Sequence, residues 1–302
     1  MEKHKPAQQD FHEATRRNTL SQSKKAFLKL MFTLVALALL GVLLLAGCQR
    51  QLIYHPHGYP PEFRHALPKG TVELPFKTKA GSQVAFYIPA NGDASHAPER
   101  LWVCCHGNAA TALHWLTTIQ LIRTSGVGFL LVDYPGYGAS TGHPTRRSIA
   151  ESSEGAYQAL ARHYQTSTAD MDKRLNILAF SIGTGVALDF AVKHPPQRIV
   201  LLAPFTSLLD MAKRTVGTPL CYVLRDRFDN AARLSELAAQ TPSSRVQLYH
   251  GQEDGVVPFS MGQSLAQKFP MMITFHPVAG AGHNDLLQRI EQNLATVLST
   301  LD

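Results

Sequence analysis

A serine surrounded by small residues lies near the middle of the chain, at the end of the segment Asn176-Ile-Leu-Ala-Phe-Ser181 and just before Gly183 and Gly185. The apolar run before it is typical of a buried strand, and the pattern after it is typical of a helix. This arrangement approximates G-x-S-x-G, the sharp turn that presents a nucleophilic serine, with Ala179 in place of the first glycine. A serine among small residues also caps many ordinary helices, so the motif alone leaves both interpretations open.

Two further polar residues follow later strand-like runs. Asp254 lies in a turn with Gly255 and Pro258, and His283 follows Gly282. A carboxylate at the end of a strand can hold a histidine in the tautomer that acts as a base. His283 would then take the Ser181 proton and return it to the leaving group. Glu253 is the alternative carboxylate.

The order of these residues strengthens the hypothesis, since Ser181, Asp254 and His283 each directly follow a predicted parallel strand. A turn carboxylate or a loop histidine is usually only solvated, but three such residues in this order predict a catalytic triad. The predicted chemistry is ester hydrolysis through an acyl-Ser181 intermediate, which water activated by His283 then cleaves. It requires no metal and no organic cofactor.

A backbone loop completes the predicted site. The segment His106-Gly107-Asn108-Ala109-Ala110 follows a predicted strand and precedes a helical pattern. Acyl transfer needs backbone N–H donors that stabilise the negative charge on the carbonyl oxygen. We assign these oxyanion donors to Asn108 and to Ile182, the residue after the nucleophile. His106 is interpreted as a structural residue of the loop.

The elements that must position these residues alternate along the chain. Strands are predicted at residues 71–77, 83–88, 101–105, 127–132, 175–180, 198–203, 245–250 and 271–276, and helices at 110–125, 147–164, 183–193, 261–269 and 285–298. No helix separates the first two strands, which indicates an antiparallel opening before a parallel series. The pattern predicts an α/β fold: one doubly wound, mostly parallel sheet of about eight strands, with the site at the carboxyl ends of its strands. The long segment 205–240 predicts a small cap.

Taken together, these motifs resemble those of α/β-hydrolases of the Bem46/ABHD13/ABHD17-like group of serine hydrolases, from about residue 52 to the C-terminus. The matching pieces are LIYHP at 52–56, HGNA at 106–109, DYPGYG at 133–138, AFSIG at 179–183, APFTS at 203–207, HG at 250–251 with Asp254, VP at 257–258 and GH at 282–283. The resemblance implies the α/β-hydrolase fold and hydrolysis of acyl esters, thioesters or lysolipids, and it leaves the substrate open. Asp133 is expected to shape a turn near the site, without a catalytic role.

The N-terminus carries a separate signal. Residues 1–29 hold seven Lys/Arg and three Asp/Glu, so they supply +4 of the net charge of +7. Residues 30–48 contain no charged side chain. About 20 apolar residues can span a bilayer, and Lys/Arg beside them keep that end in the cytoplasm. We therefore expect a basic cytoplasmic region at 1–29, a signal or transmembrane segment at 30–48, and a catalytic domain at 49–302 on the non-cytoplasmic side, in a bacterial cell envelope.

The apolar run ends in Leu45-Ala46-Gly47-Cys48, which resembles the lipobox of bacterial lipoproteins, where the cysteine thiol takes the lipid. Cys48 is therefore the predicted lipid attachment residue. The basic region is long and the apolar run exceeds the usual 7–15 residues of a secretory signal, so an uncleaved signal anchor is the alternative. The other cysteines, Cys104, Cys105 and Cys221, indicate no disulfide framework and no zinc site.

The expected partners are a small-molecule or lipid ester and the membrane. Nucleic acid is not expected, because the positive charge is concentrated in the N-terminal tail and no basic stripe runs through the folded part. Two alternatives remain: a serine peptidase on the same fold, for which the segment 205–240 looks short as a cap, and a non-catalytic binding lipoprotein, which the complete triad disfavours. The acyl-chain preference and the oligomeric state are open.

Overall fold

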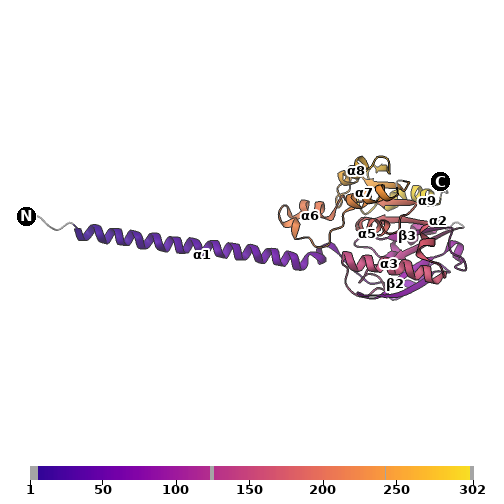
Figure 1. The fold of residues 1–302 in the computed structure, drawn as a ribbon, viewed down its shortest axis with the longest axis horizontal. Helices are drawn as coiled ribbons and strands as arrows, with labels where there is room; N and C mark the ends of the chain where they lie inside the picture. Colours follow the sequence, from indigo (N-terminus) through magenta and orange to yellow (C-terminus); the bar gives the residue numbers. More distant parts are fainter. Residues whose placement is uncertain (1–5, 123–125, 242, 300–302) are drawn as a thin grey trace, which may run out of the picture. The chain divides into compact units, whose positions relative to one another are not determined.

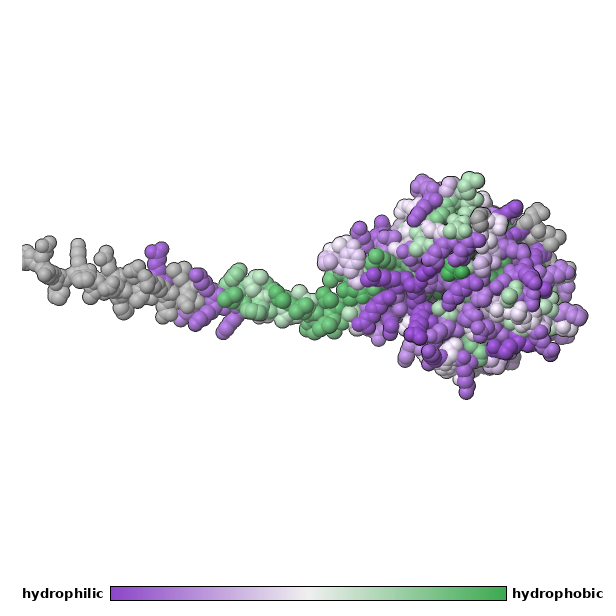
Figure 2. All heavy atoms as spheres, viewed as in Figure 1, coloured by the Kyte–Doolittle hydropathy of each residue, from purple (hydrophilic) through white to green (hydrophobic). Residues whose placement is uncertain are grey.

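The computed structural model describes residues 6–122, 126–241 and 243–299, and the chain divides into two compact units, Met1–Gln49 and Arg50–Asp302 (Figure 1). Helix α1 (Pro6–Ile53) makes up the first unit and continues to the start of the second. Its part Lys24–Ile53 has the length and apolar composition needed to cross a membrane, and signal sequences share both properties. Figure 2 shows this part as a hydrophobic stretch. Residues 1–5 of the predicted basic region lie outside the described residues.

The second unit is built on one eight-stranded sheet with the order β1-β2-β4-β3-β5-β6-β7-β8. Its strands are β1 (Val72–Thr78), β2 (Gly81–Ile88), β3 (Arg100–Cys105), β4 (Val127–Val132), β5 (Leu175–Phe180), β6 (Arg198–Leu202), β7 (Arg245–Gly251) and β8 (Ile273–Val278). β2 pairs antiparallel with both β1 and β4, and all other pairs are parallel. The predicted fold, with its antiparallel opening, is confirmed.

Helices cover both faces of the sheet, as the apolar strands require. In β3, Leu101 and Val103 belong to one buried cluster, whereas Trp102 belongs to the other, because successive side chains of a strand point to opposite faces. The first cluster takes in residues of α3 (Arg146–His163), α5 (Ile182–Ala191), α7 (Asn230–Gln240) and α8 (Phe259–Lys268). The second takes in residues of α2 (Leu116–Ile122) and α9 (Leu286–Ser299).

The predicted helix at 110–125 is a short 3-10 helix, η3 (Ala112–Trp115), that continues into α2, and residues 123–125 lie outside the described residues. Three short helices had no predicted counterpart: η1 (Phe63–Ala66), η2 (Ala90–Gly92) and α4 (Thr168–Asp172). Each has only three to five residues, too few to show a hydrophobic period.

The segment 205–240 contains α6 (Leu208–Val216), the 3-10 helix η4 (Leu220–Val223) and α7. α7 packs Leu234 and Leu237 into the core beside the sheet, so it serves as an ordinary crossover helix between β6 and β7. No residue of α6 is fully buried. Only α6 and η4 therefore add to the crossover, and their action as a cap stays a prediction.

Candidate active site

Ser181 lies in a strained turn between β5 and α5. Its φ of 54° is in the left-handed region, which costs a residue with a side chain free energy and persists only where the surroundings hold it. Here the Ser181 N–H donates to the Leu202 carbonyl at 2.9 Å, and the Ser181 carbonyl accepts from the Thr184 N–H at 2.9 Å and from its hydroxyl at 2.7 Å. The turn is therefore fixed on both sides of the serine.

Small residues after the serine allow the close approach of α5 to β3. A Cβ added to Gly183 would lie 2.5 Å from the carbonyl oxygens of Cys105 and His106, a clash with backbone that nothing could relieve cheaply. Ala179 is fully buried, so the core accommodates the methyl group that replaces the motif's first glycine. The packing thus explains both the glycine that the motif keeps and the alanine that departs from it.

The structure brings Ser181, His283 and Asp254 together. His283 Nε2 lies 3.0 Å from Ser181 Oγ, and His283 Nδ1 lies 2.7 Å from Asp254 Oδ2. A carboxylate only accepts, so Nδ1 carries the hydrogen and Nε2 presents its lone pair to the serine hydroxyl. The three residues come from the loops after β5, β7 and β8, whose carboxyl ends share one edge of the parallel sheet.

Asp254 is buried yet charged. Burial opposes its ionisation, but hydrogen bonds from His250 and His283, with the backbone N–H of Val256, outweigh burial and hold the pKa of Asp254 well below its usual range. The other carboxylate oxygen accepts from the N–H groups of Val256 and Val257, both at 2.8 Å. The alternative carboxylate, Glu253, is exposed to solvent.

His250 supports this carboxylate, a role that the sequence interpretation did not assign. The side chain is fully buried in β7, with Nε2 2.9 Å from the Val257 carbonyl and 3.5 Å from Asp254 Oδ2. A Cβ on Gly262 of α8 would lie 2.3 Å from Nδ1, so the ring is closely packed. The His-Gly pair before the turn was the available signal, but only the fold shows that this ring meets the acid.

The loop 106–110 borders the nucleophile. A Cβ on Gly107 would lie 2.7 Å from Phe180 Cδ1 and 3.6 Å from Ser181 Cβ, so only glycine allows this approach. Among the described residues, no protein group accepts the backbone N–H of Asn108. Ile182 is the first residue of α5, where N–H groups have no acceptor within the helix. Neither predicted oxyanion donor therefore has a protein acceptor for its N–H group among the described residues, and Ile182 directly follows Ser181.

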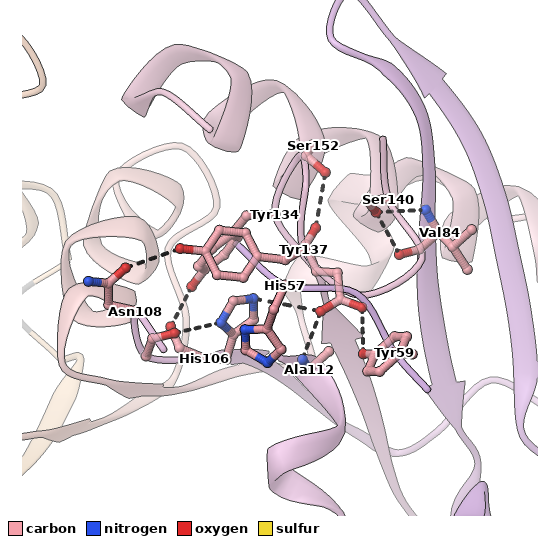
Figure 3. A network of polar contacts seen from close by, with 12 residues as sticks. His57, Tyr59, Val84, His106, Asn108, Ala112, Tyr134, Tyr137, Ser140 and Ser152 are labelled. Atoms are coloured by element: carbon pink, nitrogen blue, oxygen red, sulfur yellow. Dashed lines mark hydrogen bonds and ion pairs between the residues drawn. The ribbon is translucent and has the colours of Figure 1, made fainter. Parts of the chain in front are cut away.

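Behind this loop lies a buried polar network, drawn in Figure 3. Asp133 Oδ1 accepts the Ala112 N–H at 2.8 Å, and Oδ2 accepts the Tyr59 hydroxyl at 2.5 Å. Burial raises the pKa of Asp133 to about 6. Burial lowers the pKa of His106 to about 3, so that ring is neutral, and its Nδ1 lies 2.8 Å from the Gly107 carbonyl. Among the described residues, no hydrogen bond joins the side chain of Asp133 or His106 to the triad.

No cysteine takes part in the hydrogen bonds that join Ser181, His283 and Asp254. Cys48 is exposed in α1, while Cys104, Cys105 and Cys221 are buried as free thiols. Burial raises the pKa of Cys105 to about 12, so this thiol stays protonated at neutral pH. In the part of the chain that the structure describes, no group of three or more His, Cys, Asp or Glu residues is arranged to hold a metal ion.

Several known proteins are similar to this chain in sequence or in fold. A sequence profile of the alpha/beta hydrolase family matches residues 102–295. An uncharacterized protein of Mycobacterium tuberculosis is 31% identical over 83% of this chain and 86% of its own length. Human alpha/beta hydrolase domain-containing protein 17B is 31% identical over 56% of this chain, and the match spans 57% of that protein. The Pyrococcus furiosus esterase PF2001 superposes with a TM-score of 0.59 at 15% identity, covering 82% of this chain and 96% of that one.

Proposed function

Because the chain belongs to the alpha/beta hydrolase family, we propose that it is a serine hydrolase that cleaves carboxylic esters or thioesters through an acyl-Ser181 intermediate. One observation carries this proposal: the continuous path from Ser181 Oγ to His283 Nε2 at 3.0 Å and from His283 Nδ1 to Asp254 Oδ2 at 2.7 Å. Such a path is what a serine hydroxyl needs in order to lose its proton as it attacks a carbonyl.

Acylation follows from this geometry. Ser181 Oγ bonds to the carbonyl carbon while its proton moves to His283 Nε2, and Asp254 stabilises the imidazolium that forms. The carbonyl oxygen becomes an oxyanion, which the N–H groups of Asn108 and Ile182 stabilise. When the tetrahedral intermediate collapses, the bond to the alcohol or thiol breaks, and His283 donates its proton to that leaving group.

Deacylation repeats these steps with water. His283 Nε2 takes a proton from a water molecule as its oxygen attacks the acyl carbon. The second tetrahedral intermediate collapses by breaking the bond to Ser181 Oγ, which regains the proton from His283. The products are a carboxylic acid and the resting enzyme, so neither a metal ion nor an organic cofactor enters the balance.

The proposal includes a membrane tether through the N-terminal segment. Its support is the apolar part of α1, Lys24–Ile53, which no Asp or Glu interrupts, together with the basic residues before residue 30. We place the catalytic domain on the non-cytoplasmic side and the lipid on Cys48. Mass spectrometry of the mature protein tests this: a chain that begins with a lipid-modified Cys48 is expected, and an intact N-terminus with an unmodified thiol would instead identify an uncleaved anchor.

The test of the hydrolase uses the full chain in detergent. Wild type is expected to react with a fluorophosphonate probe and to hydrolyse a panel of esters, thioesters and lysophospholipids, and Ser181→Ala is expected to lose both. Ser264→Ala is the matched control, because that hydroxyl is exposed on α8 and, within the described part of the chain, bonds only the Ser260 carbonyl. Undiminished labelling of Ser181→Ala would overturn the assignment of the nucleophile, and turnover confined to peptide amides would overturn the ester substrate.

A further inference from the structure

The Asn108 side chain is held by the segment that follows α1. Its Oδ1 accepts from the His55 N–H at 3.0 Å and from the Tyr137 hydroxyl at 3.1 Å. The His55 N–H also lies 3.0 Å from the Tyr137 oxygen, so the three groups form a closed set (Figure 3 shows the contact between Asn108 and Tyr137). The first half of the oxyanion loop, residues 106–112, is thus attached to residue 55 through Asn108.

The other end of the oxyanion loop is held by the same segment through Asp133. The buried carboxylate accepts the Ala112 N–H on one oxygen and the Tyr59 hydroxyl on the other (Figure 3). An ionised carboxylate without donors would be costly to bury, and these two donors offset that cost. Tyr59 therefore reaches Ala112 through a single shared side chain.

The first residue of the loop is also fixed. The Tyr134 hydroxyl donates to the His106 carbonyl at 2.8 Å, and the two rings stack with centroids 3.9 Å apart. The loop therefore has attachments at His106, Asn108 and Ala112, of which the last two lead to residues 55–59. An oxyanion donor is effective only when it is held in place before the charge develops.

We propose that residues 55–59 form a positioning strap for the oxyanion loop, and that Tyr137, Asp133 and the side chain of Asn108 connect the strap to it. The inference rests on the proposed function, because it concerns the donor that Asn108 supplies. The strap begins two residues after α1 ends at Ile53, so the chain that leaves the apolar helix is itself part of the catalytic scaffold. Its residues touch no substrate and act through Asn108.

Two variants separate these hydrogen bonds from packing. The Tyr59 ring stacks on Phe63 with centroids 4.5 Å apart, and phenylalanine would keep that contact. The Tyr137 ring packs edge-on against Tyr134 at 5.7 Å, which phenylalanine would also keep. Tyr59→Phe therefore removes the hydroxyl that reaches the loop through Asp133. Tyr137→Phe removes the hydroxyl bonded to Asn108 and leaves the direct bond from the His55 N–H in place.

The matched control is Tyr157→Phe. It removes another buried tyrosine–aspartate hydrogen bond, from the Tyr157 hydroxyl to Asp172 Oδ1 at 2.8 Å, in a part of the domain that the proposed mechanism does not use. Its ring also keeps an edge-on contact, with Phe190 at 5.2 Å. Tyr157→Phe therefore shows how much activity is lost when the protein merely loses a buried tyrosine–aspartate hydrogen bond.

The experiment compares kcat, KM and trifluoromethyl ketone inhibition for the full chain in detergent, with a short soluble ester as substrate. The ketone forms a tetrahedral adduct with the serine and so depends on the oxyanion donors. We expect each strap variant to lower kcat roughly tenfold, and the double variant roughly a hundredfold, because misplaced donors lose transition-state stabilisation. The affinity for the ketone should fall by the same factors, while the KM of each strap variant stays near the wild-type value. For Tyr157→Phe, kcat, KM and ketone affinity should all stay near wild type.

The outcomes distinguish the two proposals. A wild-type protein that neither reacts with the ketone nor turns over esters would contradict the hydrolase itself. An active wild type whose Tyr59→Phe and Tyr137→Phe variants keep full kcat and ketone affinity would overturn the strap alone. Equal losses in Tyr157→Phe would also overturn it, since they would show a general effect of stability. If one strap variant does not fold, the other carries the same comparison.

Discussion

Two buried aspartates, Asp254 and Asp133, occupy similar places in the fold, but their pKa values shift in opposite directions. Each follows the carboxyl end of a parallel strand, β7 for Asp254 and β4 for Asp133. Each has a side chain with no exposed surface. The pKa of Asp254 is nevertheless held well below its usual range, whereas burial raises the pKa of Asp133 to about 6.

The donors around each carboxylate explain the difference. Asp254 has two backbone N–H groups on one oxygen and His283 on the other, with His250 nearby at 3.5 Å. Among the described residues, Asp133 accepts hydrogen bonds from the Tyr59 hydroxyl and the Ala112 N–H, and the His106 ring, with Nε2 3.7 Å away, is neutral. Burial alone therefore does not decide the charge of a carboxylate; the number and kind of its donors do. Asp254 can stabilise an imidazolium, while Asp133 is suited to hold a loop.

The largest expected effect is on kcat, which should respond very differently to changes at Asp254 and at Asp133. Asp254→Asn should lower kcat about 10³- to 10⁴-fold, because an amide favours the wrong imidazole tautomer and stabilises no positive charge. Asp133→Asn should lower kcat by no more than about tenfold, since an amide oxygen still accepts the Ala112 N–H. Steady-state hydrolysis of a soluble ester by both variants measures this. Comparable losses in the two would show that the aspartates do not differ in role.

The next effect concerns stability against pH. Folding raises the pKa of Asp133 from 3.8 to about 6, so between these values the folded state binds more protons than the unfolded state. This residue's contribution to the free energy of unfolding is therefore largest below pH 3.8 and falls as the pH rises through about 6. Over the interval from pH 3.8 to about 6, this contribution to the free energy of unfolding changes by about 3 kcal/mol, at 1.36 kcal/mol per pH unit.

Asp133→Asn removes this dependence. Relative to wild type, its free energy of unfolding should rise by up to about 3 kcal/mol between pH 4 and pH 7. Urea unfolding of both proteins across this range gives the comparison. Parallel pH curves for the two proteins would show that Asp133 does not titrate there.

The smallest expected effect concerns the hydrogen bond from His250 to Asp254. His250→Leu removes the imidazole N–H near the carboxylate and should lower kcat about tenfold, the loss of one hydrogen bond to a charged group. His250→Gln keeps a side-chain N–H and should stay within about threefold of wild type. Measured kcat values for both test this. Equal activity of His250→Leu and wild type would limit His250 to a packing role.

Local patterns were enough to predict most of the fold. The bounds of β4 and β5 agree with the prediction to the residue, because each is a short, mostly apolar run between polar or glycine-containing segments. The helix at 110–125 was less well predicted, since its first turn is a 3-10 helix. Within 205–240 the sequence did not separate the crossover helix α7 from the predicted cap, because the apolar face of α7 has the same period whether it packs on the sheet or in a cap.

By itself, the sequence determined the alternation of strands and helices, the chain order of Ser181, Asp254 and His283, and the apolar N-terminal segment. Only the tertiary structure decided which carboxylate meets His283, since Asp254 and Glu253 are neighbours in one turn and differ in direction. It also decided that the pKa values of the two buried aspartates shift in opposite directions. Hydrophobic period is a local property, whereas a pKa depends on donors distant in sequence, such as Tyr59, which lies 74 residues before Asp133.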